Sequence, residues 1–205
     1  MILPHLDIKA LEETYGPVKD WDVSDVEHLE CVFSGDFEGD LSAWDVSSVR
    51  SFALMLTGII YPGHSCLNFK SNLSAWDVSM ANSMESMFSY ATKFTSDLSD
   101  WDVSNVYGMI AMFEDARSFN SDLSKWNVGN LRYASLMFSD APTFNADLSK
   151  WKVGNVKDML GMFQWATNFT SDLSQWDTSN VEEMMLMFDN ASSFDSDLTK
   201  WNLSK

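Results

Sequence analysis

Aspartate recurs at one fixed distance from tryptophan along most of the chain, and a row of carboxylates could bind a metal ion. The position four residues before tryptophan holds Asp40, Asn72, Asp97, Asp122, Asp147, Asp172 and Asp197. In stacked units about 4.8 Å apart these carboxylates would repel one another. One interpretation is a turn in which each Asp accepts the backbone N–H two residues later. The alternative is a calcium site formed by Asp97, Asp122, Asp147 and Asp172, although Ca²⁺ takes about six to eight oxygens and one carboxylate per unit supplies fewer.

Catalytic chemistry has much weaker support in the sequence. The histidines His5, His28 and His64 occupy unrelated positions, and HExxH, CxxC and GxSxG motifs do not occur. His64-Ser65-Cys66 is a single short cluster whose ligand number and spacing do not fit a zinc site. We therefore expect no enzyme activity and no cofactor. Cys31 and Cys66 could be bridged if the insertion that carries Cys66 folds towards the first helix, but without a visible secretion signal free thiols are favoured.

The residues directly before and after each tryptophan divide by charge along the chain. In the first four units they are Asp20 and Asp22, Ala43 and Asp45, Ala75 and Asp77, and Asp100 and Asp102. In the last four they are Lys125 and Asn127, Lys150 and Lys152, Gln175 and Asp177, and Lys200 and Asn202. This pattern predicts an exposed face that is acidic at one end and basic at the other. It suits a dipolar protein partner or head-to-tail stacking of copies, and the alternative is free variation on a solvated face.

These residues belong to an internal repeat. Tryptophans at 21, 44, 76, 101, 126, 151, 176 and 201 are separated by 23, 32 and then five times 25 residues. Leu lies three residues before most of these tryptophans and Val two after, which is the spacing of one strand face. Apolar residues then follow at plus 5, 8, 11, 12 and 15, a spacing typical of one face of a short helix. The repeat predicts an α/β solenoid with one short strand and one short helix or 3-10 turn per unit, whose tryptophans and methionines form the core.

The repeat resembles a known family. Val-x-x-Met-x-x-Met-Phe-x-x-Ala, followed by Phe-Asn-x-Asp-Leu-Ser-x-Trp-Asp-Val-Ser-Asn, is similar to the BspA-like leucine-rich repeat of bacterial surface proteins and mycoplasma lipoproteins, with algal and giant-virus members. The resemblance covers nearly the whole chain. It implies a leucine-rich-repeat-like solenoid used in adhesion or protein binding, and it implies no catalytic residues. The asparagine sits one place earlier than in the usual leucine-rich repeat, so we expect a different loop there.

The ends and one insertion depart from the repeat. We expect residues 1–20 to form an N-terminal capping helix that ends at Gly16, and residues 21–205 to form seven repeats plus a truncated last strand. Either the chain was cut from a longer array, or that strand leaves an edge with which a partner or a second copy could pair. The insertion at 57–68 carries Ile59, Ile60 and Tyr61, which either contact a partner or fold back onto the repeats. Trp165 and its equivalent Tyr90 are candidates for an exposed aromatic contact.

Composition limits the partners. The net charge of −17 argues against nucleic acid, which requires a basic face. No apolar run reaches the roughly 18 residues of a membrane span. The first residues lack a basic segment followed by an apolar stretch, which favours a cytoplasmic or virion component over a secreted protein. The sequence thus predicts a non-catalytic protein-binding or structural module, with a calcium-dependent adhesin or coat component as the alternative.

Overall fold

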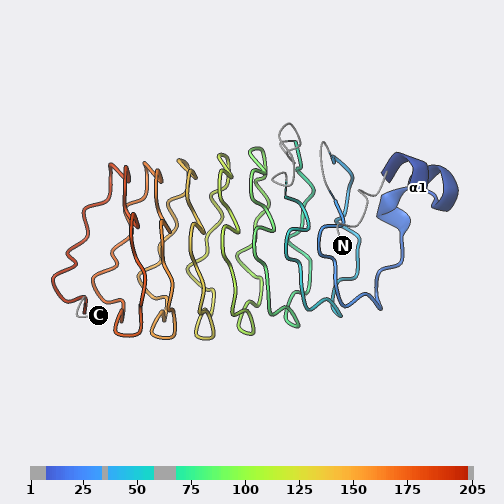
Figure 1. Cartoon of the computed structure of the whole chain (residues 1–205). Helices are drawn as coiled ribbons and strands as arrows, with labels where there is room; N and C mark the ends of the chain where they lie inside the picture. The colour runs from blue at the N-terminus through green and yellow to red at the C-terminus, as the bar shows by residue number, and fades with distance from the viewer. Residues whose placement is uncertain (1–7, 34–36, 58–67, 203–205) are drawn as a thin grey trace.

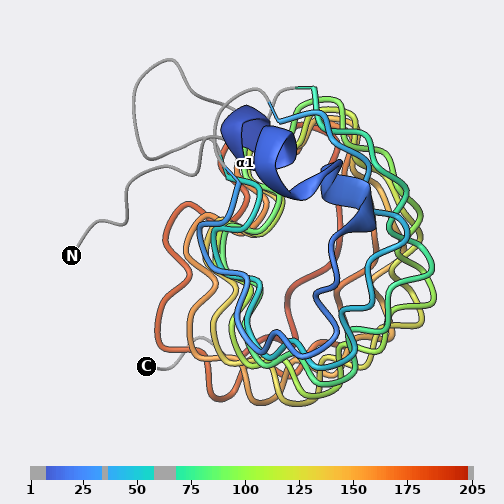
Figure 2. The same cartoon turned by 90° about the vertical axis from the view of Figure 1, so that its right-hand side faces the viewer.

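The computed structural model describes residues 8–33, 37–57 and 68–202, in which successive coils of chain are stacked along one axis (Figure 1). Viewed along this axis, the coils superimpose as a ring, and helix α1 (Ile8–Tyr15) lies at its N-terminal end (Figure 2). Helix η1 (Val18–Asp20) follows and leads into the first coil. The candidate residues Ile59, Ile60 and Tyr61 lie outside the described residues.

Helix α1 ends at Tyr15, and Gly16 follows it. Gly16 adopts a φ of 83° and its N–H donates to the carbonyl of Glu12 at 2.9 Å. Only glycine takes this left-handed conformation at little cost. The Glu12 side chain accepts the N–H of Val18 at 2.8 Å, which connects α1 to η1. Ile8 packs against the core, whereas Tyr15 is 72% exposed.

The predicted strand at each tryptophan is wrong. The segment consists of two β-turns, in which Trp101 N–H donates to Leu98 O at 3.1 Å and Val106 N–H donates to Val103 O at 2.9 Å. The turns bury leucine, tryptophan and valine on one side, as a strand would, and this explains the misleading pattern. Parallel bridging occurs instead seven residues after tryptophan, as isolated bridges between His28, Ser51, Ser83, Gly108, Tyr133, Asp158 and Glu183, each with the next.

The segment after each tryptophan turn forms neither the predicted helix nor its alternative, a 3-10 turn, because a left-handed residue interrupts it every four positions. Met112 N–H donates to Met109 O at 3.2 Å and Ala116 N–H donates to Phe113 O at 3.1 Å, which closes two consecutive turns. The third residue of each turn, Ala111 or Asp115, has a φ of 52° or 53°. A right-handed helix cannot continue through such residues. Successive turns return apolar side chains inward every three or four residues, which reproduces the helical spacing.

Other backbone N–H groups of the same turn segment connect the coils. Four of them, spaced two residues apart, donate to the next coil along its whole turn segment. In one such ladder the N–H groups of Met159, Gly161, Phe163 and Trp165 donate at 2.8–2.9 Å to the carbonyls of Glu183, Met185, Met187 and Asp189. We call the column of turn segments joined in this way, from residues 28–33 to 182–191, the bridge wall.

The opposite wall is joined largely through side chains. The indole N–H of Trp126 donates to the carbonyl of Leu98 in the preceding coil at 2.9 Å, and the other buried tryptophans repeat this bond. Between the walls, phenylalanine rings stack in two columns, with 5.7 Å between Phe113 and Phe138 and 6.1 Å between Phe119 and Phe144. Met109 and Met112 are fully buried, so methionine and tryptophan form the core, as predicted.

Candidate interaction face

Every tryptophan turn presents two exposed side chains, those directly before and after the buried indole. We call this exposed column, running from residues 20–22 to 200–202, the tryptophan-turn face. It includes the predicted Asp45, Asp77, Asp100, Asp102, Lys125, Lys150, Lys152 and Lys200, all of which are exposed. Where the acidic half meets the basic half, Lys125 Nζ lies 3.2 Å from Asp100 Oδ1. This exposed pair adds little stability, so the charge division remains available at the surface.

The aspartates four residues before tryptophan form turns, as the first interpretation predicts. Asp97 Oδ1 accepts the N–H of Ser99 at 2.9 Å and the hydroxyl of Ser121 in the next coil at 3.1 Å. The same hydroxyl accepts the N–H of Leu98 at 2.8 Å, so carboxylate and serine together join two coils. Hydrogen bonds from Ser99 and Ser121 lower the pKa of Asp97, because they stabilise the charged carboxylate.

The equivalent aspartates form the same turn. Asp122, Asp147 and Asp172 each accept the N–H two residues later at 2.9 Å, and these hydrogen bonds lower their pKa. Within the described residues, no group of three or more His, Cys, Asp or Glu could hold a metal ion. The hydrogen bonds account for the recurrence of aspartate, and no contact in this part of the chain favours the calcium alternative.

The residue after tryptophan often has a structural role as well. Asp102 Oδ1 accepts the N–H of Ser104 at 3.0 Å, and Asp45, Asp77 and Asp177 form equivalent bonds to Ser47, Ser79 and Ser179. Turn formation therefore explains the acidic residues at this position. It does not explain Lys152, nor the lysines directly before tryptophan, Lys125, Lys150 and Lys200.

Sequence reasoning missed one ladder on this wall. The amide of Asn105 donates to the carbonyl of Ser79 in the preceding coil at 2.8 Å, and Asn130, Asn155 and Asn180 repeat the contact at 2.7 Å. The signal was the recurrent asparagine four residues after tryptophan. Its displacement from the leucine-rich-repeat position suggested a different loop, but the loop still carries an inter-coil asparagine ladder.

Shallow polar grooves run between neighbouring coils beside this face. One is lined by residues that include Asp97, Asn120 and Lys125, and another by residues that include Asp122, Asn145 and Lys150. A lysine from the tryptophan-turn face thus borders each groove. Charge and hydrogen-bonding groups are thus brought together in these grooves, and the repeat sets the distance between them.

The aromatic candidates lie elsewhere. Trp165 is 47% exposed, but it belongs to the bridge wall, where its N–H donates to Asp189 O at 2.8 Å and its φ is 59°. Tyr90 occupies the equivalent left-handed position with a φ of 63°. The structure therefore does not join Trp165 to the lysines of the tryptophan-turn face. Cys31 is exposed, and its proposed partner Cys66 lies outside the described residues.

Comparison with known proteins identifies the class of repeat. Residues 8–62, 63–145 and 134–205 each match a family described as "Mycoplasma protein of unknown function, DUF285". The chain belongs to this family and is a repeat protein, which agrees with the expected mycoplasma-type repeat. No curated protein and no solved structure matches the chain. Among the described residues, none of the helices has the length and apolar character needed to cross a bilayer.

Proposed function

We propose that this chain is a non-catalytic protein-binding module, built as a leucine-rich-repeat-like solenoid of the BspA type. Its binding surface is the tryptophan-turn face, and its partner is a protein with an acidic patch that docks on the basic half. The observation that supports this most directly is the set of exposed lysines that no turn requires. Within the described residues Lys150 and Lys152 form no ion pair, although 30 acidic residues are present in the chain.

The rigidity of the repeat supports the same proposal. Each lysine is attached to a turn that is fixed by hydrogen bonds on both sides, as Lys125 is between the Asp122 turn and the indole bond of Trp126. A surface held in this way loses little conformational entropy on binding. Charge complementarity across such a surface increases the association rate and sets the register of the partner.

Charge reversal tests the proposal. The triple variant Lys125→Glu, Lys150→Glu and Lys152→Glu is compared with the wild type in affinity capture from lysate of cells that produce the protein, with retained proteins quantified by mass spectrometry. We expect at least tenfold less of the specific partner on the variant, because three attractions become repulsions. Raising the salt concentration should weaken wild-type capture in parallel, since exposed charges are screened.

A second triple variant separates the face from net charge. Arg50→Glu, Arg132→Glu and Lys157→Glu change the net charge by the same amount, but these residues lie six positions after tryptophan on the bridge wall. This control should retain the partner at the wild-type level. Equal loss from both triple variants would mean that overall charge decides capture, and unchanged capture by the first variant would exclude the tryptophan-turn face.

A further inference from the structure

Large aromatic side chains are exposed on the outer side of the bridge wall. Tyr107, Tyr133 and Trp165 are 43%, 38% and 47% exposed, although the coils that carry them have a neighbouring coil on each side. Their exposure therefore belongs to the flank of the array and does not depend on either of its ends. Aromatic side chains grouped on one exposed side are typical of a surface that contacts protein.

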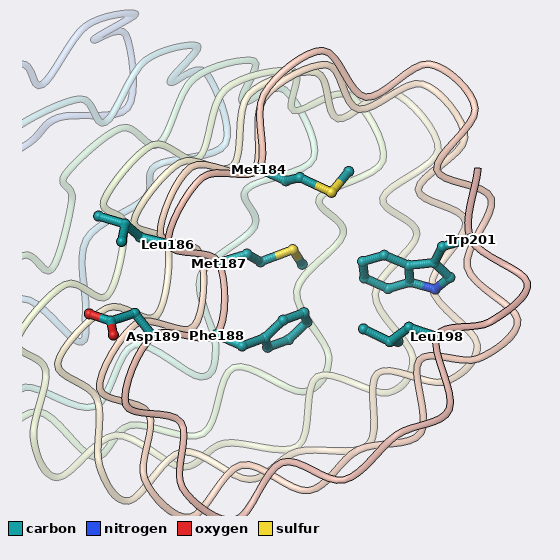
Figure 3. A pocket seen from close by; sticks show the side chains of 7 residues that line it. All are labelled: Met184, Leu186, Met187, Phe188, Asp189, Leu198 and Trp201. Atoms are coloured by element: carbon teal, nitrogen blue, oxygen red, sulfur yellow. The ribbon is translucent and has the colours of Figure 1, made fainter. Parts of the chain in front are cut away.

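Aliphatic side chains add to the same surface. Figure 3 shows the directions that the wall gives its side chains, because Met187 extends into the interior and Leu186 extends away from it. Leu136 occupies the position of Leu186 two coils earlier and is half-buried, and Ile110 and Leu160 are half-buried one position earlier in their own coils. None of these last three belongs to the hydrophobic core. We call the outer side of the bridge wall in residues 107–165 the outer bridge face.

The two margins of the outer bridge face differ in charge. The margin six residues after tryptophan consists of Tyr107, Arg132 and Lys157. The margin fourteen residues after tryptophan consists of Asp115, Asp140 and Trp165. The backbone keeps each margin in register between coils, since Arg132 N–H donates to Tyr107 O at 2.9 Å and Asp140 N–H donates to Gln164 O at 2.8 Å. The face therefore has a basic margin and an acidic margin, and the aliphatic residues come between them in each coil.

Arg132 and Asp140 carry charges that this face leaves available. They stand on opposite margins of one coil, both are exposed, and neither forms an ion pair within the described residues. Partial burial, and then the carboxylate of Asp115, raise the pKa of Asp140, whereas Arg117 lowers it. Arg117 forms its own ion pair with Asp115 at 2.8 Å. A further cation against Asp140 would stabilise the charged carboxylate, so each margin offers the charge that the other lacks.

We propose that the outer bridge face binds the same face of a second copy of this chain, with the two arrays side by side and parallel. The copies are related by a two-fold axis that runs along the array, and this rotation exchanges the two margins. Arg132 of each copy then meets Asp140 of the other, and Lys157 of each meets Trp165 of the other, whose ring attracts a cation. Each contact occurs twice, because a two-fold interface is isologous.

Charge complementarity selects this occupant and this orientation. An antiparallel second copy would place each margin against its own kind, and a partner of one charge sign would be repelled by one of the two margins. The net charge of −17 on each copy opposes any association. At an ionic strength of about 0.15 M, however, exposed charges more than about 8 Å apart are largely screened, so the contacts at the margins decide the outcome.

Exchange of the two charges tests the interface. Light scattering coupled to gel filtration measures the mass of the whole chain over a range of concentrations, and we expect a particle of twice the chain mass that dissociates on dilution. Arg132→Asp and Asp140→Arg should each weaken association at least tenfold, because like charges then meet at two points. The double variant restores both pairs in exchanged form and should associate as the wild type does.

The control for net charge is Lys150→Asp, which makes the same change as Arg132→Asp but on the tryptophan-turn face, and it should leave association unchanged. Position 140 accepts a large side chain, since Trp165 occupies the equivalent position in the next coil, and circular dichroism checks the fold of each variant. A wild type that stays a single chain at its highest soluble concentration would overturn the proposal. So would a folded double variant that associates as weakly as the single ones.

Cysteine cross-linking tests the orientation. Near the two-fold axis each residue faces its own counterpart, so Ile110→Cys and Leu160→Cys, each in a chain with Cys31→Ser and Cys66→Ser, should both form disulfide-linked dimers on oxidation. Lys150→Cys, on the opposite wall, should not. Linkage only in a mixture of the Ile110→Cys and Leu160→Cys variants would mean antiparallel copies and would contradict the proposal, as would linkage in neither.

The interface is independent of the proposed binding surface, so the two can fail separately. The triple lysine variant of the tryptophan-turn face should keep the doubled mass. The triple control variant with Arg50, Arg132 and Lys157 changed to Glu alters two residues of the outer bridge face. It should therefore lose the doubled mass and still retain the partner in affinity capture.

Discussion

At the scale of single residues, the polar side chains of the tryptophan wall connect neighbouring coils where backbone groups do so on the bridge wall. Asp97 illustrates the arrangement, because one carboxylate oxygen closes its own turn and also binds Ser121 of the next coil. Asn72 occupies the same position one coil earlier and accepts the N–H of Ser74 at 3.0 Å. The position therefore requires an acceptor oxygen, and the negative charge is dispensable for the turn.

Asp97→Ala and Asp97→Asn should accordingly differ in stability. The alanine variant loses both hydrogen bonds, and we expect its free energy of unfolding at pH 7 to fall by about 1 kcal/mol. The asparagine variant keeps the acceptor and should lose less. Urea denaturation followed by circular dichroism checks the order. Equal destabilisation by alanine and asparagine would indicate that the charge matters more than the turn.

The pH dependence of stability should also differ between the wild type and Asp97→Asn. The pKa of Asp97 is lower in the folded protein than in the unfolded chain. Its contribution to stability is therefore present above the unfolded pKa of about 3.9 and is lost as the pH falls through the folded pKa. The wild type should lose stability over this acidic range more steeply than Asp97→Asn.

At the scale of elements, the sequence predicts which residues are buried far better than it predicts the backbone between them. The positions of Leu98, Trp101, Val103 and Met109 were identified as core, and all four are buried. A strand and a series of short turns can bury side chains at the same spacing in the sequence, so periodicity alone could not distinguish the two conformations. The left-handed residues give the distinguishing signal at Asp115, Asp140, Gly161 and Asn190, whose types tolerate positive φ. Tyr90, Trp165 and the leucines at 54, 136 and 186 hide this signal, because large side chains rarely adopt a positive φ.

Gly161 tests the turn conformation directly. Its φ is 56°, and a Cβ atom there would lie 2.8 Å from Cδ2 of Leu136 in the preceding coil. Gly161→Ala should therefore destabilise the protein by about 1–2 kcal/mol, from the left-handed backbone and the contact together. Adding Leu136→Ala removes the contact. The double variant therefore shows how much of the destabilisation comes from the contact and how much from the left-handed backbone.

A double-mutant cycle in urea measures this coupling between neighbouring coils. We expect the double variant to be more stable than the sum of the two single losses predicts, because alanine at 161 no longer meets the leucine. Additive losses would show that Leu136 adjusts freely and that the cost of Gly161→Ala lies in the backbone.

At the scale of the whole molecule, each coil contacts only the coils next to it, so stability is distributed along one dimension. The candidate surfaces follow from this architecture. A face of exposed side chains accumulates along the array, because each coil adds the two residues that flank its tryptophan. The sequence could predict the charged face, because its residues recur with the repeat. It could not predict which backbone N–H groups join neighbouring coils, because that depends on the turn conformation.

The same hydrogen bond should therefore matter differently in the middle of the array and in the last coil that the structure describes. Trp126 and Trp201 both donate an indole N–H to a leucine carbonyl at 2.9 Å, and both indoles are buried. Trp126→Phe weakens a coil with neighbours on both sides and should lower the melting temperature of the whole array. Trp201→Phe should mainly accelerate hydrogen exchange of residues near 198–201 and leave the main transition almost unchanged, because the remaining coils keep all their interfaces. Calorimetry and hydrogen exchange of the two variants distinguish these outcomes. Equal lowering of the main transition would mean that the coils unfold as one cooperative unit, so that a bond in the last described coil is worth as much as a bond in the centre.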